Sequence, residues 1–262
     1  MQTIFKKNEF CIFALCSITM ILAIDFGNSF IKCAVFEQNC IIERIVFQKK
    51  DLQSTVQNCL NRYKAIKSVI VSAVSNFDKE YFTELASIIK VHIVDYNDDF
   101  PFHNLYETPK TLGIDRMVLA TGAIIQFPNQ NRLVIDAGTC ITYDFIDQKD
   151  NYLGGAIAPG LNLRYQSLHQ HTANLPLLET QIPENLIGKS TNNAIHSGVV
   201  NGLIFEIDGF IDQFKAQNEN FIIILTGGDT EFLAKRLKNT IFANSNFLLE
   251  SLNLKFQYKT EK

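Results

Sequence analysis

The sequence predicts an α/β fold built from two related units, each with a mixed sheet, and two observations lead to this prediction. First, a short apolar strand running into Asp-x-Gly occurs twice, at Leu22–Gly27 (LAIDFG) and at Leu133–Gly138 (LVIDAG). Second, each half opens with three strand-like segments and continues with alternating helices and strands. A duplicated unit of this kind predicts two lobes, and the cleft between them is the expected ligand site.

Length and composition are those of a globular protein. The chain has 262 residues, enough for one large domain or two small ones, and 47% of them are apolar, which suffices for a packed core. The net charge is −3 without a run of like charges, so we expect no nucleic acid and no membrane as partner. The six cysteines contain no CxxC pair and are interpreted as reduced thiols of a cytoplasmic protein.

The N-terminal residues resemble a targeting segment. Lys6 and Lys7 precede the apolar run 10–24, as in a signal peptide, but the run is too short to span a bilayer comfortably. Cleavage near its end would remove the first predicted strand. We therefore expect residues 1–19 to be an N-terminal extension or the product of a misassigned start, with Met20 as the natural first residue of the fold.

Residues 20–130 are expected to form the first lobe. After the opening strand, two apolar segments flank the polar turn 37–39 and are followed by a segment with helical spacing. A β-branched strand, a helix capped by Asp78 and another short strand come next, and a loop with Pro109 leads into a buried helix. The expected strands are Ile21–Ile24, Ile31–Phe36, Ile41–Phe47, Ser68–Val74 and Val91–Val94, and the expected helices are Leu52–Tyr63, Tyr81–Ile89 and Met117–Ile125.

Residues 131–262 are expected to form the second lobe, because the same order of elements starts again. Three strands are followed by two helical stretches, a strand of continuous apolar residues, a helix, a short strand and a final helix. The expected strands are Leu133–Ile135, Ile141–Ile146, Tyr152–Ala158 and Phe221–Leu225, and the expected helices are Leu161–Leu168, Ala194–Phe214, Glu231–Leu237 and Phe247–Leu252.

The two Asp-x-Gly turns suggest that the protein handles phosphate groups. Glycine allows the backbone to approach phosphate oxygens, and the exposed N–H groups donate to them. Asn28, Ser29 and Thr139 add neutral donors. Because an aspartate cannot contact phosphate favourably without a cation between them, Asp25 and Asp136 imply bound metal ions. The alternative for Asp25 is a turn aspartate bonded to its own backbone.

Two further segments could contribute to a site. Thr226–Gly228 follows an apolar strand and offers a close backbone approach suited to a nucleoside. Asp115 lies in the segment Gly113–Arg116 (GIDR). It is either an N-cap of the following helix beside a solvated arginine, or a general base beside an arginine that holds a substrate. The residues alone leave both interpretations open.

The chain resembles type III pantothenate kinases, members of the superfamily that also contains acetate and sugar kinases, actin and heat-shock chaperones. The resemblance implies two RNase H-like lobes around a nucleotide cleft. It extends from about Met20 to the C-terminus. The motifs that carry it are Asp25–Ser29, Tyr106 with Gly113–Arg116, Asp136–Thr139, Gly154–Gly160, Thr172–Pro176, Gly188–Thr191 and Thr226–Gly228.

The resemblance implies ATP-dependent phosphorylation of pantothenate to 4'-phosphopantothenate, the first step of coenzyme A biosynthesis. It implies that Asp115 is the proton acceptor, that Asp136 binds a monovalent cation (K⁺ or NH₄⁺), and that Asp25 holds Mg²⁺ through water. Homodimers with the substrate site near the subunit interface are also implied. The implied ATP-binding residues are Asp25, Phe26, Gly27, Asn28, Ser29, Phe30, Ile31, Lys32 and Thr139; the implied pantothenate-binding residues are Tyr106, Gly113, Ile114, Asp115, Arg116 and Thr191.

The chain departs from the family pattern at two positions of the first phosphate turn. Ser29 replaces the usual threonine but keeps the hydroxyl, and Phe30 replaces a small or polar residue. Two alternatives stand beside pantothenate phosphorylation. One is a catalytically inactive nucleotide-binding regulatory protein on the same fold, and the other is a kinase of the superfamily with an acetate-like or sugar-like substrate.

Overall fold

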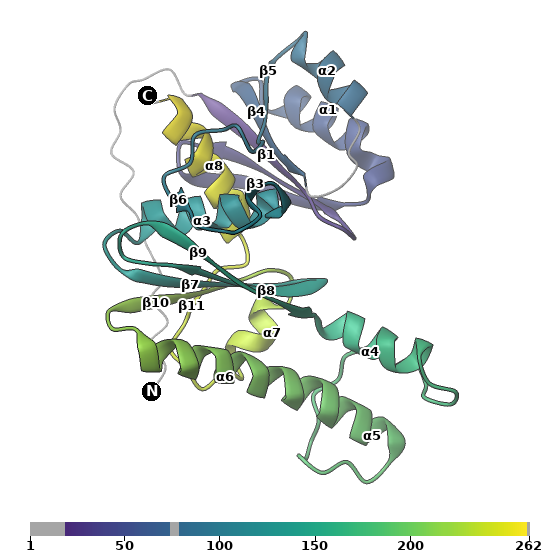
Figure 1. Ribbon diagram of the computed structural model, residues 1–262. Coiled ribbons are helices and arrows are strands. Elements are labelled where there is room, and N and C mark those ends of the chain that lie inside the picture. The colour runs from purple at the N-terminus through teal and green to yellow at the C-terminus, as the bar shows by residue number, and fades with distance from the viewer. Residues whose placement is uncertain (1–18, 74–78, 261–262) are drawn as a thin grey trace.

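The computed structural model describes residues 19–73 and 79–260. Within them the protein has two sheets stacked one above the other, with helices between them and on both outer faces (Figure 1). This confirms the predicted α/β fold with mixed sheets. Residues 1–18, the end of the predicted strand at Val74 and the predicted helix cap Asp78 lie outside the described residues.

The first sheet has the strand order β3-β2-β1-β4-β5. Strand β2 runs antiparallel to its neighbours β1 and β3, whereas β4 and β5 run parallel to β1. Helices α1 and α2 cover the outer face of this sheet. The elements are β1 (Met20–Phe26), β2 (Ile31–Glu37), β3 (Cys40–Phe47), a short 3₁₀ turn (Lys49–Asp51), α1 (Leu52–Arg62), β4 (Ile66–Ala73), α2 (Lys79–Ala86) and β5 (Lys90–Ile93).

The second sheet repeats this plan around β7, in the order β11-β10-β7-β8-β9-β6. Strands β7, β8 and β9 are antiparallel, and β10 runs parallel to β7 as β4 does to β1. The strands are β6 (His103–Asn104), β7 (Asn131–Ala137), β8 (Cys140–Ile146), β9 (Asn151–Pro159), β10 (Phe221–Thr226) and β11 (Phe242–Ala243). Strand β6 comes from the first half of the chain. It was not predicted because a strand of two residues is too short to show an alternation of apolar and polar side chains.

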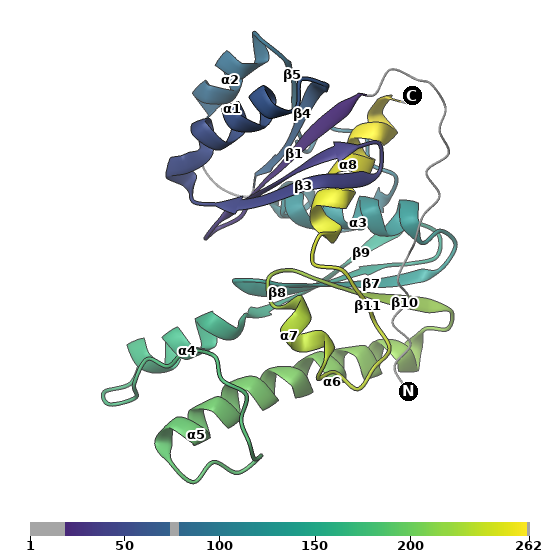
Figure 2. The ribbon, with the colours of Figure 1, turned by 180° about the vertical axis from the view of Figure 1, so that it is seen from behind.

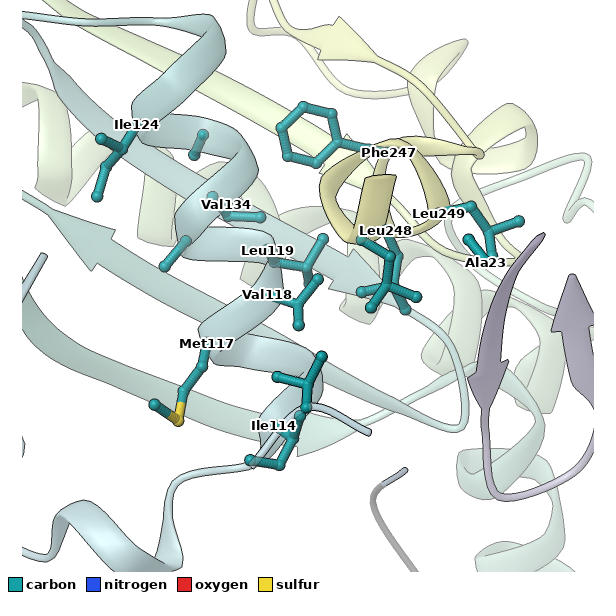
Figure 3. Close-up of a cluster of buried hydrophobic side chains, with 14 of the residues drawn as sticks. Ala23, Ile114, Met117, Val118, Leu119, Ile124, Val134, Phe247, Leu248 and Leu249 are labelled. Atoms are coloured by element: carbon teal, nitrogen blue, oxygen red, sulfur yellow. The ribbon is translucent and has the colours of Figure 1, made fainter. Parts of the chain in front are cut away.

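Helices α3 (Ile114–Gln126) and α8 (Phe247–Thr260) lie between the two sheets. Their apolar side chains form one core with residues from both sheets, such as Ala23 of β1 and Val134 of β7 (Figure 3). The two helices come from different halves of the chain, so their packing joins the halves. The expected division into lobes at residue 130 stays a prediction.

Helix α8 extends eight residues beyond its predicted end at Leu252, since 260 − 252 = 8. The prediction ended too early because the extension contains polar residues, which a sequence pattern does not indicate as buried. Asn253 Nδ2 donates to the carbonyl of Gln38 at 2.8 Å, and the fully buried Lys255 lies 3.6 Å from the carboxylate of Asp98. These partners are more than 150 residues distant in sequence, so no local pattern reveals them (253 − 38 = 215; 255 − 98 = 157).

The outer face of the second sheet is covered by a long helical run that begins at Thr191 (Figure 2). The predicted single helix Ala194–Phe214 is thus longer at both ends and contains a π-helical turn. The stretch 191–217 has 27 residues and is long and apolar enough to cross a membrane, but half of its most apolar window is buried inside the protein. The helices here are α4 (Leu161–Gln170), α5 (Thr191–His196), the π-helical turn (Ser197–Asn201), α6 (Gly202–Gln217) and α7 (Thr230–Ala234).

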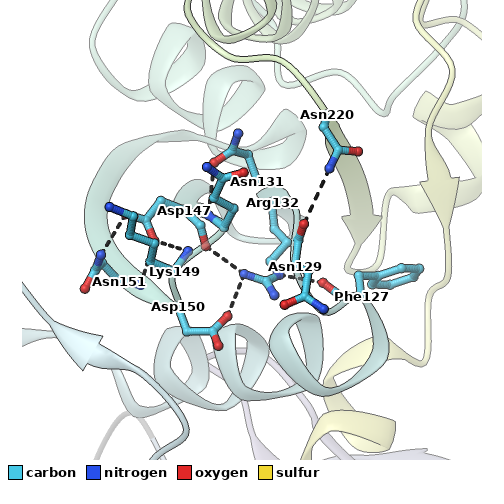
Figure 4. A network of polar contacts seen from close by, with 10 residues as sticks. Phe127, Asn129, Asn131, Arg132, Asp147, Lys149, Asp150, Asn151 and Asn220 are labelled. Atoms are coloured by element: carbon cyan, nitrogen blue, oxygen red, sulfur yellow. Dashed lines mark hydrogen bonds and ion pairs between the residues drawn. The ribbon is translucent and has the colours of Figure 1, made fainter.

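The buried guanidinium of Arg132 anchors the start of β7 (Figure 4). Its Nε donates to the carbonyl of Phe127 at 2.8 Å, and its Nη1 donates to the carbonyl of Asp147 at 2.7 Å and pairs with Asp150 at 2.9 Å. These contacts tie the end of α3 and the turn between β8 and β9 to β7. The other end of β7 carries Asp136, so this network supports a strand that reaches the candidate site.

Candidate active site

Asp25 lies at the end of β1, where the first sheet faces the helices between the lobes. Its carboxylate is buried and accepts a hydrogen bond from Ser72 Oγ of β4 at 2.7 Å. The turn-aspartate alternative expected the carboxylate to bond its own backbone, whereas in the structure it bonds a side chain of a neighbouring strand. Burial raises the pKa of Asp25 to about 6, while the bond from Ser72 and the charge of Lys32 oppose the rise.

Asp136 occupies the equivalent position at the end of β7. Burial raises its pKa to about 7, and Lys32 opposes this rise. The charges of Asp115 and Asp25 raise the pKa of Asp136 further, which means that these three carboxylates share one neighbourhood. Lys32 stands opposite Asp25 in the β1–β2 pair and supplies positive charge to both strand ends.

The two predicted phosphate turns meet across the lobes. The hydroxyls of Ser29 and Thr139, 110 residues apart in sequence, lie 3.4 Å from each other. The backbone is tightly packed behind them, since a Cβ at Gly160 would stand 2.1 Å from the carbonyl oxygen of Gly138. Phe30 is half exposed. The exposed residues Asn28, Ser29 and Thr139 are thus available to a ligand.

Asp115 lies in the first turn of α3, whose N-cap residue is Gly113. The N-cap interpretation of Asp115 is therefore wrong. Its Oδ1 accepts a hydrogen bond from the backbone N–H of Arg116 at 2.8 Å, which holds the carboxylate at the start of the helix. Burial raises the pKa of Asp115, and the bond from Arg116 opposes the rise. The neighbouring Ile114 packs its side chain into the core between the sheets.

Arg116 is buried and paired with Asp144 of β8, so the solvated-arginine interpretation is wrong. Nε and Nη2 of Arg116 lie 2.8 and 2.7 Å from Oδ1 of Asp144. The same oxygen accepts a hydrogen bond from the Tyr152 hydroxyl at 2.5 Å, and Oδ2 accepts one from Thr142 Oγ1 at 3.2 Å. Burial raises the pKa of Asp144, whereas Arg116 and Tyr152 favour its charged form.

Sequence reasoning missed Asp144, although a signal for it exists. It stands at the middle of the apolar strand β8 (CITYDFI), where a carboxylate must be buried and therefore paired. Its partner Arg116 comes 28 residues earlier and could not be identified from spacing. Asp144 is a structural neighbour of the predicted site residues, and it fixes the guanidinium beside Asp115.

Tyr106 completes the group at the start of α3. Its ring centroid lies 5.9 Å from the guanidinium carbon of Arg116 and 6.2 Å from the ring of Tyr152. Gly154 of β9 lies beside this ring: an added Cβ would stand in ordinary contact, 3.5 Å from Tyr106 Cδ2, and it is the φ of +111° that favours glycine here. The structure thus brings together the predicted residues Tyr106, Gly113, Asp115 and Arg116.

Thr191 is the predicted substrate residue that lies elsewhere. It is exposed and forms the first residue of α5. Both ribbon views place α5 at the far end of the second lobe, well away from α3 (Figures 1 and 2). A single chain therefore does not carry Thr191 to Asp115.

The segment Thr226–Gly228 closes the site on the side of β10. Thr226 is the last residue of β10 and stands in register with Asp136 of β7. Gly227 has φ of +98°, and a Cβ there would lie 2.3 Å from the carbonyl oxygen of Ala137 and 2.5 Å from Oδ1 of Asp136. Glycine is needed here because the Asp136 carboxylate rests against the backbone.

Two matching Asp-x-Gly turns that meet at Ser29 and Thr139, with a buried carboxylate at a helix start near them, are typical of kinases that act on small molecules. A family model described as type III pantothenate kinase matches residues 21–213. A type III pantothenate kinase of Flavobacterium johnsoniae is 60% identical over 242 residues, covering 92% of this chain and 99% of that protein. One of Bacteroides fragilis is 39% identical and covers 91% of this chain and 98% of its own length. The chain belongs to the type III pantothenate kinase family.

Solved structures agree on the fold at much lower identity. A Campylobacter jejuni protein assigned to the Baf family of transcriptional activators has a TM-score of 0.62 at 21% identity, covering 92% of this chain and all (100%) of that one. A glucokinase from an Antarctic psychrotroph has a TM-score of 0.51 at 10% identity, covering 91% and 99%. At these identities the likeness shows the two-lobed fold alone.

Membership of the family establishes the reaction. The protein is a kinase of coenzyme A biosynthesis that transfers a phosphoryl group to pantothenate, and kinases generally take it from ATP with Mg²⁺. The relatives give no support to an inactive regulatory protein.

Proposed function

We propose that the phosphoryl transfer takes place between the two phosphate turns and the start of α3, with Asp115 accepting the proton of the pantothenate hydroxyl. The observation that carries the proposal is the meeting of Ser29 and Thr139 across the lobes, near the three neighbouring carboxylates Asp25, Asp115 and Asp136. Phosphoryl transfer needs positioning and charge compensation more than covalent chemistry, and this arrangement offers both.

The ATP phosphates would lie along Asp25–Lys32 and against Thr139. Exposed hydroxyls, an amide and backbone N–H groups suit phosphate oxygens, and Lys32 compensates their charge. Asp25 would hold Mg²⁺ through water. The fit is supported by the burial of its carboxylate. Burial raises the pKa of Asp25 because it disfavours the negative charge, and a bound cation would stabilise that charge. The ion would neutralise charge on the phosphates.

Asp115 is suited to the role of base by position and environment. The hydrogen bond from the backbone N–H of Arg116 orients its carboxylate, and burial raises its pKa, which makes it a better proton acceptor than an exposed aspartate. In a loose transition state the hydroxyl proton leaves late, so a carboxylate within hydrogen-bond reach suffices.

Pantothenate would bind against Tyr106 and the segment Gly113–Arg116. The aromatic ring and the helix start offer an apolar wall and backbone donors. Asp144 already neutralises the charge of Arg116. The guanidinium would therefore bind the substrate by hydrogen bonds from the N–H groups that do not contact Asp144, and not by net charge.

Asp136 would hold the monovalent cation, K⁺ or NH₄⁺. Its pKa of about 7 shows how strongly burial disfavours the bare carboxylate, and a bound cation would relieve this. The hydroxyl of Thr226 is buried, has no hydrogen-bond partner among the described residues and stands in register with Asp136, so it also fits an ion at this place. The cation would add positive charge near the transferring phosphate.

A homodimer would explain the distant position of Thr191. The segment before α5 exposes several large apolar side chains, and so do β9 and α6; a second subunit could cover them. Thr191 of the partner subunit would then reach the site. The residues concerned are Leu177, Ile182, Leu186, Ile187, Ile157 and Phe205. We place the enzyme in the cytoplasm, since Cys33, Cys59 and Cys140 are free thiols.

The variant Asp115→Asn tests the proposed base. It keeps the size of the side chain but removes the proton acceptor, so kcat should fall at least about a hundredfold with KM for pantothenate little changed. The measurement is steady-state ADP release, with Asp95→Asn on an exposed loop as the control. A kcat within about threefold of the parent would remove Asp115 from this role.

A further inference from the structure

The two halves of the protein carry the same pair of positions at the ends of two parallel strands. In the first lobe, Asp25 of β1 stands in register with Ser72 of β4. In the second lobe, Asp136 of β7 stands in register with Thr226 of β10. Each pair therefore sets a carboxylate beside a hydroxyl on a neighbouring strand, and side chains in register share one face of the sheet.

The two hydroxyls differ in what they bind. Ser72 Oγ donates to Asp25 at 2.7 Å. Thr226 has 1% of its surface exposed, and its Oγ1 finds no hydrogen-bond partner among the residues that the structure describes. A buried hydroxyl without a partner is costly, so its presence indicates a ligand that the protein chain does not provide.

The Asp136 carboxylate lies next to this hydroxyl. Gly227, directly after Thr226, would bring a Cβ to 2.5 Å from Asp136 Oδ1, so the carboxylate rests on the backbone that carries Thr226. In the described part of the chain no group of three or more His, Cys, Asp or Glu side chains is arranged to hold a metal ion. One carboxylate with neutral oxygens is a ligand set for an ion of low charge.

We propose that Thr226 Oγ1 is a direct ligand of the monovalent cation on Asp136. The inference rests on the proposed role of Asp136. In the first lobe the Ser72 hydroxyl donates a hydrogen bond directly to a carboxylate oxygen of Asp25. In the second lobe the hydroxyl is left unbonded, and its oxygen lone pairs can face an ion that the carboxylate also contacts. The pair at Asp136 is thereby specialised for a cation, although the two lobes share one plan.

The test measures cation binding without turnover. Thermal unfolding is followed while KCl replaces NaCl at constant ionic strength, and the K⁺ concentration for half of the full shift in Tm is determined. Thr226→Val keeps the shape and removes the oxygen, so this concentration should rise about tenfold or more. Thr226→Ser keeps the oxygen and should stay within about twofold of the parent, as should the matched control Ser72→Ala in the other lobe.

A second variant keeps the test decisive if Thr226→Val does not fold. Thr226→Cys exchanges the hard oxygen for soft sulfur, so binding of K⁺ should weaken while binding of Tl⁺, followed by ²⁰⁵Tl NMR, should be retained. Unchanged K⁺ dependence in Thr226→Val or Thr226→Cys would overturn the proposal, as would a loss confined to ATP binding. If the parent itself shows no K⁺-specific shift, the assignment of Asp136 fails instead.

Discussion

Replacing Asp144 with alanine would leave the buried guanidinium of Arg116 without its counter-ion. Asp144 is fully buried and takes contacts at 2.8 and 2.7 Å from Arg116 and at 2.5 Å from the Tyr152 hydroxyl. Removing one partner of a buried ion pair costs about 3–5 kcal/mol. For a chain of this size that corresponds to a fall in Tm of about 6–20 °C. Because Arg116 adjoins Asp115, we expect kcat to fall as well.

The assay is thermal unfolding together with steady-state ADP release, and two controls separate the causes. Thr142→Val removes the bond at 3.2 Å to the other oxygen of Asp144 and should cost only about 1 kcal/mol. The double variant Asp144→Leu with Arg116→Met removes both charges, so it should recover much of the lost stability without recovering kcat. A loss below about 1 kcal/mol in Asp144→Ala would refute the role of this pair.

Three further predictions concern the cation, the glycine beside it and the dimer. Burial raises the pKa of Asp136 from 3.8 to about 7, so the folded protein holds an extra proton between these values. Without a cation, the stabilising contribution of protonated Asp136 is lost as the pH rises through 7. A K⁺ ion should therefore raise Tm more at pH 8, where Asp136 is charged, than at pH 5.5. An equal shift in Tm at both pH values would contradict the account. Gly227→Ala would force a Cβ to 2.3 Å from a backbone oxygen at φ of +98° and should lower both Tm and K⁺ affinity, with Gly228→Ala as the control because a Cβ there meets nothing within 4 Å. Asp115→Asn and Thr191→Val should each be inactive alone, yet mixed subunits should recover about a quarter of parent activity, because one site in half of the dimers is intact; no recovery after subunit exchange would count against a shared site.

The repeated strand-and-turn pattern made much of the fold predictable. Period and apolar content identified β1 and β7 with their carboxylates, because both signals are local. The elements that failed depend on distant partners. Strand β6 pairs with β9, and in the last turns of α8 Asn253 donates to the carbonyl of Gln38 while Lys255 forms an ion pair with Asp98.

In the candidate site too, residues within local sequence patterns were predicted, and a residue whose role depends on a distant partner was not. Asp25, Asp115 and Asp136 follow recognisable local patterns, and the structure brings them into one neighbourhood. Asp144 was missed because its meaning depends on Arg116, which approaches from another element. Thr191 shows a different limit: its motif is local, but it lies at the start of α5, and in the proposed dimer its place in the site would depend on a second subunit.

The central claim, that the carboxylates between the two lobes carry cation-assisted phosphoryl transfer to pantothenate, is tested most directly by one measurement. ADP release is recorded with ATP and Mg²⁺, with and without pantothenate, in KCl and in NaCl at equal ionic strength. We predict release that requires pantothenate, is fast in KCl and is at least about tenfold slower in NaCl. Release that ignores pantothenate, or equal rates in the two salts, would contradict the account.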